Sequence, residues 1–185
     1  KWISKARQLA DAMIIEFFDE EEGGFFLSGK AKEQLVSKLK NPADEAMPSA
    51  NAIASLALLK LGRLTGIKVY LEKSEGTLRT FQPFMEQNPV AFTGLLSTLN
   101  SSNMAPTEVV FAGPIEGPAF EEMWEVLNTD YRPNKVTLWN ENGESTLPLA
   151  EGKTSYDSAV YLCQKGPCYP PVKNGKAFDR LLDRP

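Results

Sequence analysis

The sequence predicts a mainly α-helical protein. Helical hairpins of a partial α/α toroid are expected over residues 1–105, and a small α/β (βαβ) segment packed on these helices over 106–185. Apolar residues recur at steps of three and four through most of the first hundred residues, which is the period of an amphipathic helix. Short β-branched and aromatic runs at 108–112 and 135–139 then flank a helical stretch, a pattern typical of a parallel strand pair.

The first helical segments differ in how much of their surface is apolar. Residues 2–18 place one apolar stripe on a helix that ends at the acidic, glycine-bearing run 19–24. A minor helix is expected over 31–40. Ser49 is a natural N-cap for the next helix, 50–64, which is apolar nearly all round and is therefore expected to be buried on every side.

The helices that follow complete an alternating pattern. Residues 67–86 combine one apolar stripe with one charged face, as an outer helix does, and Asn88-Pro89 then opens a moderately buried helix. Amphipathic and buried helices thus alternate, which is typical of a two-layer ring of helical hairpins. A simple bundle would show one apolar stripe on each helix.

The second part of the chain has shorter elements. A third strand is expected over 159–163, a polar loop over 140–157 and a terminal helix over 175–183. The run Gly113 to Gly117 follows the first strand at its carboxyl end, where α/β proteins often bind ligands. It lacks the glycine spacing of a phosphate-binding loop, so we expect a structural loop.

Composition excludes several function classes. The 185 residues carry a formal net charge of −4 and no Lys/Arg-rich run, so we expect no nucleic-acid partner. No apolar stretch is long enough to span a membrane and no signal peptide is present, which predicts a cytoplasmic protein without a membrane partner. The chain has no histidine, which removes Ser/His/Asp and Cys/His arrangements and the commonest zinc ligand. We expect no cofactor and no metal.

Cys163 and Cys168 form a C-x4-C pair. A redox pair is one interpretation. Reduced thiols are the interpretation we prefer, because disulfides are rare in cytosolic proteins. A zinc site would need further ligands, and none is nearby in the sequence.

Several segments resemble one protein family. Phe18-Asp19 with Gly23-Gly24-Phe25 resembles an F-D-x-x-x-G-G-F segment, and residues 44–52 resemble D-G-A-x-P-S-G-N-S. Shorter matches are Leu64-Thr65-Gly66, Glu108-Val109-Val110, and Tyr161-Leu162-Cys163 with Cys168 and Pro171. Their order and spacing are similar to the C-terminal part of the thioredoxin-domain-containing family of the spermatogenesis-associated protein 20 type.

The resemblance implies an N-terminal thioredoxin-like domain and first helical hairpins that this chain lacks, and a toroid similar to six-hairpin glycosidases. These missing parts of the same polypeptide are the expected partners, and self-association of this piece is a further expectation. The start at Lys1-Trp2-Ile3, already in helical pattern, agrees with a start inside a longer protein. Glu45, Ala50 and Ala52 depart from the family pattern, and the last of these removes a hydroxyl.

The candidate ligand-binding residues are Asp19, Asp44, Ser49 and Asn51. Asp44, Ser49 and Asn51 cluster at the start of a buried helix, where free N–H groups suit a sugar-like ligand, and we expect Asp44 and Asn51 at the edge of an open groove. The alternative is that Ser49 only caps the helix and Asn51 satisfies nearby backbone. Asp19 and Asp44 could form a carboxylate pair of the glycosidase type, or be turn residues.

Two functions follow from these observations. The first is a carbohydrate-binding or carbohydrate-active toroid, which is an inference by fold analogy. The second is a non-catalytic helical scaffold that supports an N-terminal thioredoxin-like redox domain. No complete catalytic motif is present, so the sequence does not assign a reaction.

Overall fold

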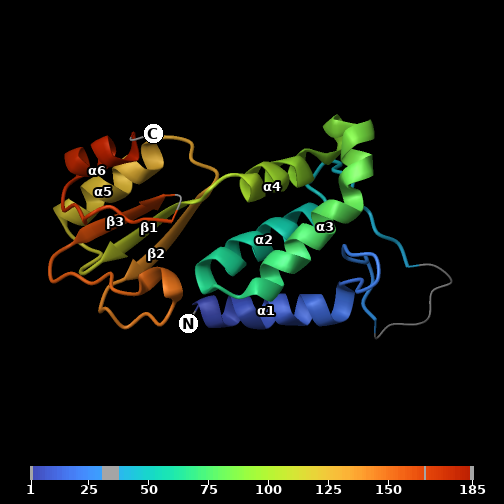
Figure 1. Cartoon of the computed structure of the whole chain (residues 1–185), viewed down its shortest axis with the longest axis horizontal. Helices are drawn as coiled ribbons and strands as arrows, with labels where there is room; N and C mark the ends of the chain where they lie inside the picture. The colour runs from blue at the N-terminus through green and yellow to red at the C-terminus, as the bar shows by residue number, and fades with distance from the viewer. Residues whose placement is uncertain (1, 31–37, 165, 184–185) are drawn as a thin grey trace. The chain divides into compact units, whose positions relative to one another are not determined.

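The computed structural model describes residues 2–30, 38–164 and 166–183. The chain divides into two compact units, Lys1–Arg63 with Ile67–Asn103 and Leu64–Gly66 with Met104–Pro185. The first is helical, and the second combines a three-stranded sheet with two α-helices (Figure 1). The protein is therefore mainly α-helical with a small α/β part, as the sequence predicts.

Among its described residues, the first unit contains four α-helices. They are α1 (Trp2–Phe17), α2 (Ala50–Thr65), α3 (Lys68–Gln87) and α4 (Thr93–Asn103), with the 3-10 turn η1 (Pro89–Phe92) before α4. The helices expected over 2–18, 50–64 and 67–86 are confirmed within a few residues. Of the minor helix expected over 31–40, residues 31–37 lie outside the described residues and 38–40 are not helical.

Small residues let α2 pack closely against its neighbours. Ser55 and Ser74 bring α2 and α3 together, with their hydroxyl oxygens 3.0 Å apart. A Cβ atom on Gly62 would lie 2.6 Å from the Leu71 side chain, and one on Gly94 of α4 would lie 2.8 Å from the Cβ of Ala52. Helix α2 therefore approaches α3 and α4 more closely than larger side chains would allow.

One face of α2 is exposed to solvent, so the described residues of this chain do not bury the helix on every side. Ile53 is 53% exposed, and Ala50, Ala57 and Lys60 are exposed along the same face. Helical periodicity reports which residues are apolar and does not report whether the residues that cover them belong to the same chain.

The second unit is built on a mixed sheet. It contains β1 (Thr107–Ala112), α5 (Pro118–Thr129), β2 (Lys135–Asn140), the 3-10 turn η2 (Pro148–Ala150), β3 (Ala159–Gln164) and α6 (Gly175–Leu182). The strand order is β2-β1-β3. The predicted parallel pair is confirmed: β1 runs parallel to β2 with Thr107 opposite Lys135, and β3 is antiparallel to β1.

Both faces of this sheet are buried. On one face, side chains of β1 and β3 pack with Met123 and Leu127 of α5 and Phe178 of α6. On the other, Val110 and Leu138 pack with residues of η2. The sheet is therefore the centre of two apolar clusters, one on each side.

Cys163 and Cys168 form a disulfide, with the two sulfur atoms 2.08 Å apart, so the expectation of two reduced thiols is wrong. The chain turns back after β3 and places Cys168 directly opposite Cys163 in an antiparallel bridge. The sequence interpretation relied on the cellular compartment, whereas this local pairing brings the two sulfur atoms together.

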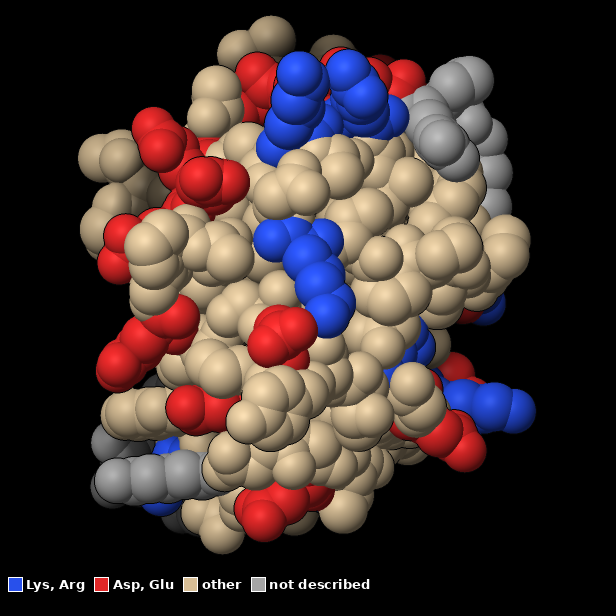
Figure 2. All heavy atoms as spheres, turned by 90° about the vertical axis from the view of Figure 1, so that its left-hand side faces the viewer, with Lys and Arg blue, Asp and Glu red and all other residues tan. Residues whose placement is uncertain are grey.

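On the face in Figure 2, acidic and basic side chains are interspersed among uncharged ones. In the described part of the chain, each helix is too short or too polar to cross a bilayer.

Two helical glycines give a matched test of the packing of α2. We expect Gly76→Ala to raise the free energy of unfolding by about 0.5–1 kcal/mol, because its Cβ would meet only Phe18 at 3.8 Å and alanine favours helix. Gly62→Ala should instead lower it by about 1–3 kcal/mol through overpacking against Leu71. Urea unfolding followed by circular dichroism measures both, and equal effects of the two changes would contradict the close α2–α3 packing.

Candidate functional site

Asp44 connects the starts of two helices. One carboxylate oxygen accepts a hydrogen bond from the Ser49 N–H at 2.8 Å. The other accepts from the Gly94 N–H at 2.7 Å and the Thr93 hydroxyl at 3.0 Å, and so caps α4. Burial by itself would raise the pKa of Asp44, but these hydrogen bonds outweigh it and hold the pKa below the ordinary value. Asp44 is thus a carboxylate whose two oxygens both have protein partners.

Ser49 and Asn51 lie at the first turn of α2. Ser49 is buried, and its hydroxyl accepts from the Ala52 N–H at 3.1 Å, which is N-cap geometry. Asn51 is fully buried, with 0% of its surface exposed. Its carbonyl oxygen accepts from the Phe25 N–H at 2.7 Å, and its amide nitrogen donates to the Phe25 carbonyl at 3.0 Å.

The position of Asn51 differs from the expected one. We expected Asn51 at the edge of an open groove, and the structure places it in the interior. The physical reason is that the Phe25 peptide is itself buried and needs both a donor and an acceptor, which a single amide side chain supplies.

Asp19 follows α1 and holds an acidic turn. One carboxylate oxygen lies 2.6 Å from the Lys40 amine, and the other accepts from the N–H groups of Glu21 and Glu22 at 2.9 and 3.3 Å. Burial would raise the pKa of Asp19, but the bonds from Lys40 and the two amides lower it below the ordinary value. Lys40 also donates to the Gly23 carbonyl at 2.9 Å.

The two glycines of this turn have structural roles. Gly23 and Gly24 adopt φ values of +80° and +78°, which side-chain-bearing residues rarely adopt. A Cβ on Gly23 would also lie 2.5 Å from the Thr80 hydroxyl of α3. The turn brings the Phe18 and Phe25 rings together edge-to-face, with their centroids 5.1 Å apart. The F-D-x-x-x-G-G-F segment is therefore a tight turn that closes the end of α1.

The four candidate residues lie in two neighbouring groups and do not line one pocket. Asp44 and Ser49 meet directly, whereas Asn51 binds Phe25, next to the turn that Asp19 holds. The sequence did not identify Lys40, Thr93 and Gly94 as partners. Thr93 and Gly94 lie 49 and 50 residues from Asp44, so no local pattern signals the contact.

The described residues of the first unit form grooves on its surface. One, of about 620 Å³, is lined by residues of α2, α3 and α4, including Leu59, Leu78 and Arg79, and by none of the four candidates. Another, of about 460 Å³, is lined by the 18–23 turn and by α3, and includes Asp19. Among the described residues, no three His, Cys, Asp or Glu side chains are grouped so that they could hold a metal ion.

Comparison with known proteins gives relatives of low identity. No family model matches the sequence. Spermatogenesis-associated protein 20 of Homo sapiens is 28% identical over 189 residues, a match that covers 98% of this chain and 24% of that protein. The Mus musculus protein of the same name is 26% identical with the same coverage. This chain is homologous to spermatogenesis-associated protein 20.

A more distant species gives a similar match. An uncharacterized protein of Caenorhabditis elegans, B0495.5, is 26% identical over 191 residues, which is 100% of this chain and 26% of that protein. The chain therefore spans about a quarter of the length of the curated relatives it matches. The resemblance noted from the motifs is confirmed at the level of homology.

Replacement of Asn51 tests the buried amide contact. We expect Asn51→Ala to lower the free energy of unfolding by about 2–4 kcal/mol, because the buried N–H and C=O of Phe25 both lose their partner. Asn100→Ala, at an exposed position of α4, is the control and should change it by less than about 0.5 kcal/mol. Urea unfolding of both variants is the measurement, and similar small effects would show that the contact contributes little.

Proposed function

We propose that this chain is the C-terminal quarter of a longer cytoplasmic polypeptide, in which it serves as a non-catalytic helical scaffold. The observation that carries this proposal is the environment of the Asp19 and Asp44 carboxyl groups, which sets their pKa values and their hydrogen-bond partners. A glycosidase acid must hold its proton near neutral pH, which requires a raised pKa. Both carboxylates have a lowered pKa instead, and their oxygens are engaged by protein donors.

The exposed helix faces support the part of the proposal that places this chain in a longer polypeptide. Helix α2 contacts α3 on one side through Ser55 and Gly62, and by helical periodicity its exposed Ile53 face points the opposite way. On α1, Trp2 and Leu9 lie seven residues apart on one face and are 80% and 61% exposed. Two of the helices therefore present large apolar side chains to solvent.

We assign these exposed faces to contact with the rest of the polypeptide. Burying one such side chain stabilises a protein by roughly 1.5–3 kcal/mol relative to leaving it exposed. The relatives are about four times as long as this chain, so the rest of such a polypeptide could cover the faces. The missing N-terminal part, with its first helical hairpins and thioredoxin-like domain, is the proposed partner. The thioredoxin-like domain would carry out any redox or protein-folding reaction. Sugar binding is the alternative function.

Replacement of Asp44 separates the scaffold from a carbohydrate-active toroid. Asp44→Asn should lower the free energy of unfolding at pH 7 by about 0.5–2 kcal/mol, the usual cost of a lost helix cap. The folded-state pKa is lowered, so the wild-type carboxylate stabilises the fold above its unfolded pKa of about 3.9. This contribution is lost as the pH falls through the folded pKa, and the difference between variant and wild type should shrink there.

The measurement is urea unfolding between pH 7 and 3, with the exposed Glu72→Gln as control. The longer polypeptide is assayed in parallel against a panel of aryl glycosides and sugars. On the scaffold proposal, Asp44→Asn leaves any turnover per folded molecule unchanged. Loss of turnover or of sugar binding, with stability intact, would favour the carbohydrate function.

The exposed apolar faces give a second test. Leu9→Gln with Ile53→Gln should leave the stability of this chain nearly unchanged, because both side chains are already exposed, and should reduce its self-association. In the longer polypeptide the same changes should lower stability by several kcal/mol. Val90→Gln, 82% exposed on the same unit, is the matched control. Sedimentation and urea unfolding give both readouts, and equal effects of Val90→Gln and the double change would contradict a specific interface.

A further inference from the structure

A short segment covers the outer edge of β3. One edge of β3 pairs with β1, and along the other the chain returns over residues 167–172. Val160 and Val172 exchange two backbone hydrogen bonds, of 2.8 and 3.0 Å. Tyr169 donates to the Leu162 carbonyl at 2.8 Å. An exposed edge strand can pair with a strand of another molecule, and proteins commonly cover such edges. The 167–172 segment therefore protects the outer edge of β3 from this pairing.

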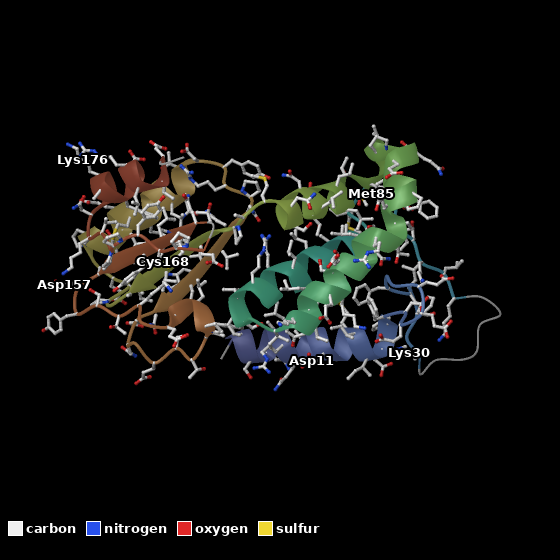
Figure 3. All side chains as sticks on the ribbon, in the orientation of Figure 1. Asp11, Lys30, Met85, Asp157, Cys168 and Lys176 are labelled. Atoms are coloured by element: carbon white, nitrogen blue, oxygen red, sulfur yellow. A yellow bond between two sulfur atoms is a disulfide. The ribbon has the colours of Figure 1, made fainter. Side chains whose placement is uncertain are left out.

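The disulfide closes this cover at one end. Cys163 belongs to β3 and is buried, whereas Cys168, labelled in Figure 3, is exposed. At the other end, the cover is held by the partly buried side chain of Val172 against the core and by an exposed ion pair between Lys173 and Asp157. Beside the exposed Cys168, the disulfide adds a covalent closure to the backbone hydrogen bonds made by Pro167 and Tyr169.

Cys163 is buried and Cys168 is exposed, and this difference determines which cysteine an external thiolate meets first. Exchange requires that a thiolate reach one sulfur of the disulfide, and exposed disulfides are the labile ones. The chain has only these two cysteines, so no internal thiol can compete. An external thiolate therefore meets Cys168 first.

We propose that the Cys163–Cys168 bond is a thiol–disulfide exchange site that a dithiol reductant opens, releasing the 167–172 segment from β3. A thiolate of the reductant attacks the Cys168 sulfur, the sulfur–sulfur bond breaks, and Cys163 leaves as a thiolate that takes a proton. The second thiol of the reductant then attacks the mixed disulfide and frees Cys168. Two electrons pass to the protein, and the reductant becomes a disulfide.

Reduction changes what β3 presents to solvent. Without the disulfide, the 167–172 segment is held by backbone hydrogen bonds, by the partly buried side chains of Tyr169 and Val172, and by the surface ion pair. The segment therefore separates from β3 more often. Opening frees the outer N–H and C=O groups of β3 for another strand. In a reducing compartment such as the cytosol, the open form would be favoured.

The test uses the whole chain in its oxidised form. Ellman's reagent, applied in denaturant after excess dithiothreitol has been removed, should find no thiol before reduction and two after reduction under native conditions. Hydrogen exchange should then rise by roughly tenfold or more at the amides of Val160, Tyr169 and Val172, and stay unchanged at Val109 in β1. The proposal is overturned by a bond that dithiothreitol reduces only in denaturant, or by unchanged exchange at these amides after reduction.

The site of attack is tested separately. With glutathione in place of the dithiol, peptide mass analysis should find the mixed disulfide on Cys168. Glutathione on Cys163 would overturn the assignment. Cys163→Ser with Cys168→Ser should reproduce the exchange pattern of the reduced wild type, and the reduced wild type alone decides the proposal where that variant does not fold.

Discussion

The contact between the Asn51 amide and the Phe25 peptide determines how the first unit closes. Asn51 lies in the first turn of α2 and is fully buried, so its two hydrogen bonds fix the loop after α1 against that helix. With the Phe25 peptide satisfied, the Phe25 ring can be buried against Phe18. The positive φ values of Gly23 and Gly24 then follow, because the chain must turn back between Phe18 and Phe25 within a few residues. An unsatisfied amide at this position would leave two buried polar groups without partners.

The same geometry explains why residues that resemble a functional motif act as structural ones. Asp19 receives hydrogen bonds from the turn and an ion pair from Lys40, and Asp44 joins the starts of α2 and α4. In each case burial opposes ionisation and the donors more than compensate, so both carboxyl groups ionise more easily than in water. Tyr70 shows the opposite result, since burial together with its hydrogen bond to Asp11 of α1, the residue labelled in Figure 3, raises its pKa. Environment, not residue type, decides which groups could take part in proton transfer.

Sequence reasoning identified the parts of the fold that depend on local chemistry. Helical periodicity located α1, α2 and α3, a serine marked the start of α2, and two β-branched runs identified the parallel pair β1 and β2. It failed where the outcome depends on contacts that no periodic pattern signals. The partners of Asp44 in α4 lie about fifty residues away, and the return of the chain along β3 has no periodic signal. The apolar character of α2 likewise does not show which of its faces has a neighbour within this chain, as the exposure of Ile53 illustrates.

The two units leave different parts of their own surfaces uncovered. The second has an apolar cluster on each face of its sheet and a cover on the outer edge of β3, using α5, α6, η2 and the 167–172 segment. The first leaves Trp2 and Leu9 of α1 and Ile53 of α2 exposed, although α2 packs closely on α3 and α4. Single exposed apolar residues are ordinary, but several large ones on two helices that pack together are consistent with an interaction surface. On the proposal that this chain belongs to a longer polypeptide, the remainder would meet the helical unit through α1 and the exposed face of α2.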